Sequence, residues 1–139
     1  MKDEELIRLA DEARKNAYAP YSGYTVGAAL LASDGSVTVG CNVENASYGA
    51  TVCAERVAFS RAVADGKHEF LAIAVVGGRC GQPAETRFHP CGICRQVMRE
   101  FCRDEFRVLV GNGEEIVCHT LGELLPAGFS SDAMKETRP

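Results

Sequence analysis

Three cysteines and one glutamate have spacings that suit catalysis at a metal. Cys53 lies two residues before Glu55, and Cys91 and Cys94 follow further along the chain as a C-x-x-C pair. Two cysteines three residues apart at a helix start can direct both sulfurs at one point, and a third thiolate from a second helix adds a third ligand. Catalytic Zn²⁺ keeps a fourth, open position for water, whereas structural Zn²⁺ is usually held by four protein ligands. The pattern therefore predicts one catalytic zinc ion held by Cys53, Cys91 and Cys94.

Glu55 is the predicted acid and base of that site. A carboxylate two residues from a zinc ligand can take a proton from zinc-bound water and pass it to a ring nitrogen and then to a leaving amine. C-A-E on one helix, combined with P-C-x-x-C on another, is the signature of zinc-dependent deaminases, which include a Cys₃ ligand set. A lone C-x-x-C would be weak evidence, but the combination is specific.

Two arginines are predicted to balance the charge of the site. Three thiolates on one Zn²⁺ leave a net negative centre, so a positive group is expected nearby. Arg56 directly follows Glu55, and Arg95 directly follows Cys94. We expect both to donate hydrogen bonds to thiolate sulfur from outside the ligand set.

The remaining sequence indicates the elements that position these residues. Apolar residues at helical spacing predict a helix over 3–18 with Asp3 as its N-cap, and Asp34-Gly35 between two apolar runs predicts a hairpin. Thr51 is the expected cap of the next helix. The complete expectation is helices over 3–18, 51–65, 91–102 and 121–125, and strands over 25–33, 36–41, 70–76, 106–110 and 115–119. This order predicts an α/β fold, a three-layer α-β-α sandwich with a mixed five-stranded sheet, in one domain over 1–139.

Composition restricts the classes of function. The chain has 139 residues, 46% of them hydrophobic, and a formal net charge of −4. No apolar run approaches the roughly 20 residues that span a bilayer, and the charged N-terminus does not resemble a signal peptide, so we expect a cytoplasmic protein without membrane contact. The scattered lysines and arginines argue against a nucleic-acid partner and favour a small substrate. Seven cysteines, an odd number, argue against a disulfide framework.

The sequence also resembles a known family. The stretches TVGAALL, GCNVENASYG, CAER, PCGICRQ and ELLPAGF occur in this order and are similar to those of the small, homotetrameric, zinc-dependent cytidine deaminases. The similarity extends over about residues 18 to 129. It implies hydrolysis of cytidine and deoxycytidine to uridine and deoxyuridine with release of ammonia, in pyrimidine salvage, through a zinc-bound hydroxide that attacks C4 of the ring.

The resemblance also implies roles for residues around the metal. Asn42 and Glu44 would bind the ribose hydroxyls, and the backbone of Ala54 and Cys91, with Glu55, would hold the pyrimidine edge. Sites in this family form at subunit junctions, so Tyr48 and Phe129 would be contributed by neighbouring chains of a homotetramer.

Two positions depart from the family pattern at the edge of the expected pocket. Tyr24 stands where the family usually has a phenylalanine that packs on the base, and it adds a hydroxyl group. His89 stands before Pro90-Cys91, where a small residue is common. Both departures bear on substrate range more than on the type of reaction.

Other interpretations of these residues remain open. The alternative for the cysteines is that they are buried and inert or form a redox pair. The alternative for Glu55 is that it only complements a helix dipole, and for Asn42 and Glu44 that they are ordinary loop residues. For Tyr48 and Phe129, simple packing is an equal alternative. Among whole functions, the alternatives are a zinc aminohydrolase acting on a modified cytosine nucleoside such as blasticidin S, a deaminase of RNA or DNA, and a non-catalytic zinc or thiol module.

Overall fold

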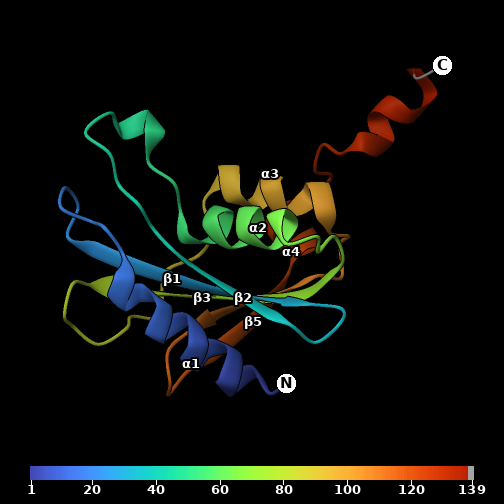
Figure 1. Cartoon of the computed structure of the whole chain (residues 1–139). Helices are drawn as coiled ribbons and strands as arrows, with labels where there is room; N and C mark the ends of the chain where they lie inside the picture. The colour runs from blue at the N-terminus through green and yellow to red at the C-terminus, as the bar shows by residue number, and fades with distance from the viewer. Residues whose placement is uncertain (138–139) are drawn as a thin grey trace.

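A mixed five-stranded sheet forms the middle layer of the protein (Figure 1). The computed structural model describes residues 1–137, and the side chains of residues 1–134. The strand order is β2-β1-β3-β4-β5; β3 and β4 are parallel and the other neighbours are antiparallel. The strands are β1 (Tyr24–Ala32), β2 (Val37–Cys41), β3 (Phe70–Arg79), β4 (Arg107–Gly111) and β5 (Ile116–Thr120). The predicted mixed sheet is confirmed.

Helices cover both faces of this sheet. Helix α1 (Asp3–Ala13) lies on one face, and α2 (Ala54–Ala64) and α3 (Gly92–Phe101) lie side by side on the other (Figure 1). The short α4 (Leu121–Leu124) follows β5, and three 3₁₀ segments complete the described chain: Arg14–Asn16, Tyr48–Ala50 and Ser131–Thr137. This arrangement is the three-layer α-β-α sandwich that the sequence predicted.

Two apolar cores explain why the central strands are apolar on both faces. In β3, Ile73 and Val75 pack among the residues of α2 and α3, whereas Ala72, Ala74 and Val76 pack toward α1. Successive side chains of a strand point to opposite faces, so a strand covered on both sides needs an unbroken apolar run. The stretch predicted as a buried strand is therefore buried for the expected reason.

The ends of two helices differ from the prediction. Helix α1 ends at Ala13 and continues only as a 3₁₀ turn to Asn16. Its N-cap is Lys2 rather than Asp3, whose carboxylate instead accepts a hydrogen bond from Arg107 at 2.7 Å. The expected helix 3–18 was therefore too long, and its cap was wrong.

Helix α2 also begins later than predicted. Its N-cap is Cys53, and Thr51 is not the cap; the Thr51 hydroxyl accepts from the Asn45 amide at 3.2 Å. The intervening Val52 forms an antiparallel bridge with Val43, which keeps this segment extended until Cys53. The consequence is that Cys53 itself lies at the tip of the helix.

Candidate active site

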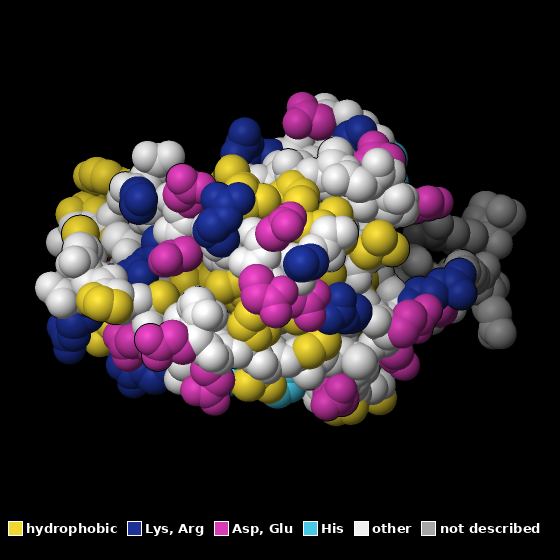
Figure 2. All heavy atoms as spheres, turned by 90° about the horizontal axis from the view of Figure 1, so that it is seen from below, with side chains coloured by type: hydrophobic (Ala, Val, Ile, Leu, Met, Phe, Trp, Pro, Cys, Tyr) yellow, Lys and Arg dark blue, Asp and Glu magenta, His cyan; other side chains and the backbone are white. Residues whose placement is uncertain are grey.

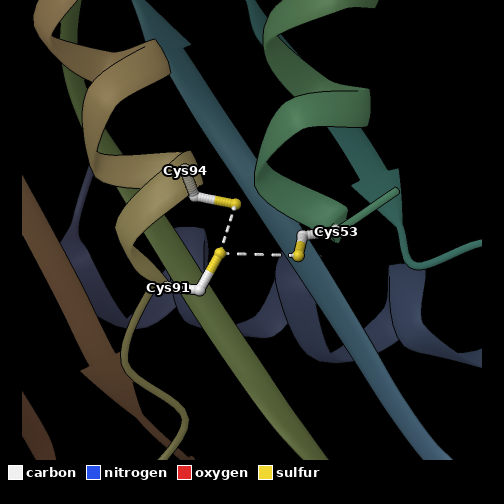
Figure 3. A group of neighbouring side chains, drawn as sticks. All are labelled: Cys53, Cys91 and Cys94. Atoms are coloured by element: carbon white, nitrogen blue, oxygen red, sulfur yellow. Dashed lines mark hydrogen bonds between the residues drawn. The ribbon is translucent and has the colours of Figure 1, made fainter. Parts of the chain in front are cut away.

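The three predicted zinc ligands lie at the starts of two neighbouring helices. Cys53 is the N-cap of α2, Cys91 is the N-cap of α3, and Cys94 lies in the first turn of α3. Figure 3 shows their sulfurs turned toward one another. The Sγ atoms of Cys53 and Cys91 are 3.8 Å apart, those of Cys91 and Cys94 are 3.5 Å apart, and all three lie within 4.8 Å of one another.

This cluster fits a zinc ion by the chemistry and spacing of its donors. Sulfurs at about 2.3 Å from a tetrahedral Zn²⁺ are separated by roughly 3.8 Å, close to the distances between these thiols. The aligned peptide dipoles at the N-termini of α2 and α3 also favour negative charge on sulfur. Three thiolates leave one tetrahedral position open, which is the arrangement of a catalytic rather than a structural site.

The pKa values of the cluster thiols depend on one another. The neighbouring Cys94 thiol, together with the Arg56 guanidinium, lowers the pKa of Cys53 to about 5. The same interaction with Cys53, together with burial, raises the pKa of Cys94. The negative charge of the free cluster therefore resides first on Cys53, at the tip of α2.

Glu55 lies in the first turn of α2 and is 4% exposed. Burial raises the pKa of its carboxyl to about 7, because a desolvated carboxylate is disfavoured relative to the neutral acid. A group with a pKa near neutrality can both accept and release a proton under physiological conditions. The position and environment of Glu55 are those of a proton carrier.

The two arginines have different partners. One Nη atom of Arg56 donates to the Thr51 carbonyl at 3.2 Å and lies 3.7 Å from the sulfur of Cys53. Arg95 instead donates from Nε to the Pro90 carbonyl at 2.8 Å and from Nη1 to the Leu124 carbonyl at 2.7 Å. Arg56 thus makes the expected sulfur contact, whereas the hydrogen bonds of Arg95 join the segment before Cys91 to the end of α4.

A pocket of about 270 Å³ opens beside the thiols and Glu55. Tyr24, Asn42 and Ala54, all expected in the site, line it together with Cys53, Glu55 and Cys91. His89, expected at the edge of the pocket, also lines it. Its other lining residues were not predicted as site residues: Ser22, Val26, Thr51, Val75 and Phe88. Nearness to Cys91 in sequence was the available signal for Phe88, whereas Val26 and Val75 carry only an ordinary strand pattern.

Asn42 and Glu44 hold the backbone at the mouth of this pocket. Asn42 accepts from the Val26 amide at 2.8 Å and donates to the Tyr24 carbonyl at 2.9 Å. The carboxylate of Glu44 accepts from the Tyr21 amide at 2.9 Å and from both the amide and the hydroxyl of Ser22. Each side chain keeps spare hydrogen-bonding capacity, since an amide carries two donor hydrogens and a carboxylate about four acceptor sites.

Tyr48 and Phe129 lie away from the pocket of their own chain. Tyr48 is 74% exposed on a segment that projects from the body of the protein, and its ring meets Tyr21 at 5.8 Å between centroids (Figure 1). Phe129 is 62% exposed, and its carbonyl accepts from Gln96 at 2.8 Å. A single chain does not bring these two aromatic residues to the thiols.

The two residues that depart from the family pattern both line the pocket. The Tyr24 ring lies 5.7 Å from that of Phe88, and the Arg79 guanidinium lies 5.2 Å from the Tyr24 centroid. The imidazole of His89 lies 5.3 Å from that of His119. Neither histidine joins the three-sulfur cluster.

An α/β sandwich that brings three potential metal-binding thiols together beside a buried carboxylate is typical of a zinc-dependent hydrolase. Comparison with known proteins specifies the family: the model for the cytidine and deoxycytidylate deaminase zinc-binding region matches residues 1–110. The chain belongs to this family.

Individual relatives agree with that assignment. Cytidine deaminase of Halalkalibacterium halodurans is 47% identical over 139 residues, covering 98% of this chain and 100% of the relative. The crystal structure of cytidine deaminase from Burkholderia pseudomallei has a TM-score of 0.83 and 48% identity, covering 93% of this chain and 100% of that one. Blasticidin-S deaminase of Bacillus cereus is more distant, at 29% identity over 132 residues, covering 93% of both.

Proposed function

We propose that this protein hydrolyses cytidine and deoxycytidine to uridine and deoxyuridine with release of ammonia, as a cytoplasmic enzyme of pyrimidine salvage. The observation that carries the proposal is the buried Glu55 beside three convergent thiols at one pocket. Cytidine deaminases at 47% and 48% identity over nearly the whole chain support the choice of substrate.

The chemistry requires a proton carrier at the carbon that loses its amine. Net reaction adds water at C4, forms a carbonyl there and expels the amino group as ammonia. Zn²⁺ held by Cys53, Cys91 and Cys94 would supply Lewis acidity toward the attacking water. Glu55 takes a proton from the water and delivers it to the ring nitrogen next to C4. It then transfers the second proton to the departing amino group, so that the carboxylate is regenerated.

The rest of the pocket positions the nucleoside for that transfer. The spare donor of Asn42 and the remaining acceptor site of Glu44 suit ribose hydroxyls, which both donate and accept hydrogen bonds. The ring of Tyr24 offers an apolar face for the pyrimidine. Backbone groups of Ala54 and Cys91, at two helix starts, provide polar contacts to the pyrimidine edge together with Glu55.

Assembly would complete the site. We infer a homotetramer in which Tyr48 and Phe129 of neighbouring chains close the pocket. Two large aromatic side chains exposed on a single chain support this inference, because exposed aromatic residues are enriched at protein interfaces. Both apolar cores share one sheet, which supports the further proposal that residues 1–139 form a single domain.

The face that carries α1 has a mixed charge pattern. Figure 2 shows acidic and basic side chains interspersed over the face that carries α1, with acidic groups beside basic ones. Phosphate backbones bind where positive charge is concentrated, so this face lacks the character of a nucleic-acid groove. Among residues 1–137, no helix combines the length and apolar character needed to cross a membrane.

Relative rates on three substrates test the proposal. We expect turnover of cytidine and deoxycytidine, followed by ultraviolet absorbance, and much slower turnover of blasticidin S. Faster turnover of blasticidin S would favour the modified-nucleoside alternative. Absence of turnover on all three, in protein that contains zinc, would leave a deaminase of RNA or DNA, if the protein also binds oligonucleotides in a salt-sensitive way, and otherwise a non-catalytic zinc or thiol module.

A further inference from the structure

Phe88 forms a second aromatic wall of the pocket. Its ring meets that of Tyr24 with 5.7 Å between centroids and 48° between planes, so the two rings make a corner rather than a stack. Both residues line the pocket that contains Cys53, Glu55 and Cys91. Phe88 lies three residues before Cys91, on the segment that leads from β3 into α3.

A glycine on β3 provides the space that the Phe88 ring occupies. A Cβ at Gly77 would lie 2.6 Å from Cγ and 2.7 Å from Cδ1 of Phe88, and the nearest atoms it would meet all belong to this ring. The Gly77 carbonyl also accepts from the Glu85 amide at 2.8 Å, which holds the segment before Phe88 against the strand. The ring is therefore seated directly on the strand backbone.

The Phe88 and Tyr24 rings border two hollows. An open surface hollow of about 330 Å³, the outer hollow, is lined by Tyr24, Arg87 and Phe88. The same two rings line the first pocket, so the two hollows meet at these rings. Removing one ring would join the two volumes without touching the thiols or Glu55.

We propose that Phe88 is a specificity-determining residue that limits the size of the pyrimidine accepted beside the metal. In the wild-type protein, the Phe88 ring keeps alkyl groups on C5 or on the exocyclic amine of the base out of the outer hollow. Removal of the Phe88 ring opens this space to them. The inference rests on the proposed deamination of cytidine and extends it to the range of substituted cytosine nucleosides.

Substrate competition with the Phe88→Ala variant tests this assignment. We measure kcat/KM for cytidine, 5-methylcytidine and N4-methylcytidine, the last releasing methylamine. We expect about tenfold higher KM for cytidine, from lost packing, and at least a tenfold rise in relative kcat/KM for one or both methylated substrates. A ratio between substrates is unaffected by any fraction of misfolded enzyme, so a merely structural role would leave it unchanged.

The Gly77→Ala variant tests the position of the Phe88 ring independently. Its methyl group should displace the Phe88 ring and raise the KM for cytidine, whereas in the Phe88→Ala background the same change should have little effect. Gly113→Ala is the matched control, since a Cβ there meets no atom within 4 Å.

Two negative results have separate meanings. If the wild-type protein deaminates cytidine but Phe88→Ala leaves all substrate ratios unchanged, Phe88 does not determine specificity. If the wild type does not deaminate cytidine, the proposed function fails, and the inference fails with it.

Discussion

The metal end and the outer end of the pocket are built in different ways. At the metal end, two helix starts within one chain bring three sulfurs within 4.8 Å of one another and bury Glu55 beside them. Tyr48 and Phe129, which were expected to close the outer end of the pocket, the end away from the thiols, are exposed and do not line it. The comparison indicates that local helix geometry sets the reactive groups, whereas no contact within one chain brings the exposed Tyr48 and Phe129 to the pocket.

The largest expected effect is the loss of turnover when the proton carrier at the metal end is removed and the metal is retained. Glu55→Gln keeps the size of the side chain but removes the proton carrier, so turnover of cytidine should fall by a factor on the order of 10²–10⁴ or more. Zinc content and thermal stability should stay close to wild type, because none of the thiol ligands changes. Absorbance assays and metal analysis on the same preparation measure both. Unchanged turnover would show that Glu55 only complements the helix dipole.

A smaller effect is expected from the group that balances the sulfur charge. Arg56→Gln removes a cation 3.7 Å from the Cys53 sulfur, and zinc affinity should fall roughly 10–100-fold. Competition with a chelator of known affinity measures this change. The charge-balance interpretation fails if the variant binds zinc as tightly as the wild type.

Arg95→Gln is the matched comparison for that variant. Its guanidinium donates to the carbonyls of Pro90 and Leu124 rather than to sulfur. We therefore expect lower thermal stability but a smaller loss of zinc affinity than for Arg56→Gln. An equal loss of zinc affinity would show that Arg95 also acts on the metal site, as the sequence had suggested.

The outer end should respond to changes in a neighbouring chain. If Phe129 closes a partner's pocket, Phe129→Ala should raise the KM for cytidine about tenfold while leaving zinc content unchanged. Co-assembly with Glu55→Gln chains should then restore part of the wild-type behaviour, because some pockets would combine an intact Glu55 with an intact Phe129. Co-expression followed by kinetics measures this recovery.

Leu71→Ala supplies the control for the Phe129 experiment. Leu71 is also an exposed hydrophobic residue, but it lies on β3 and does not line the pocket. Its substitution should leave the KM unchanged. Failure of Phe129→Ala and Glu55→Gln chains to complement one another, in assemblies shown to be mixed, would argue against shared sites.

The difference between the two ends also determines how much could be predicted from sequence. The cluster of three cysteines was predictable because helix starts give C-A-E and P-C-x-x-C a fixed geometry, and the strand pattern predicted the sheet. Thr51 was wrongly taken as a cap because the bridge from Val52 to Val43 is a tertiary contact without a local signal. Phe88 was missed for the same reason, since its seat on Gly77 joins segments that no short motif connects.

Ser22→Ala has the smallest expected effect. It tests whether the Ser22 hydroxyl stabilises the position of Glu44 at the mouth of the pocket. The Ser22 hydroxyl donates to the Glu44 carboxylate and accepts from the Tyr24 amide at 3.0 Å. Removing it should destabilise the protein by about 1 kcal/mol at neutral pH, the usual net contribution of one hydrogen bond. Urea denaturation of the two proteins measures this difference in the free energy of unfolding.

The pH dependence of that difference identifies Glu44 as the partner. Burial alone would raise the pKa of Glu44, but hydrogen bonds from Ser22 and Tyr21 outweigh it and lower the pKa below the ordinary 4.5. A depressed folded-state pKa contributes stability that is present above the unfolded value and is lost as pH falls through the folded value. The difference in free energy of unfolding between wild type and Ser22→Ala should therefore decrease as the pH falls below 4.5. In a Glu44→Gln background, the difference caused by Ser22→Ala should vary little with pH. If the difference in free energy of unfolding between wild type and Ser22→Ala does not change with pH, the contribution of Ser22 comes from its hydrogen bond with Tyr24 instead.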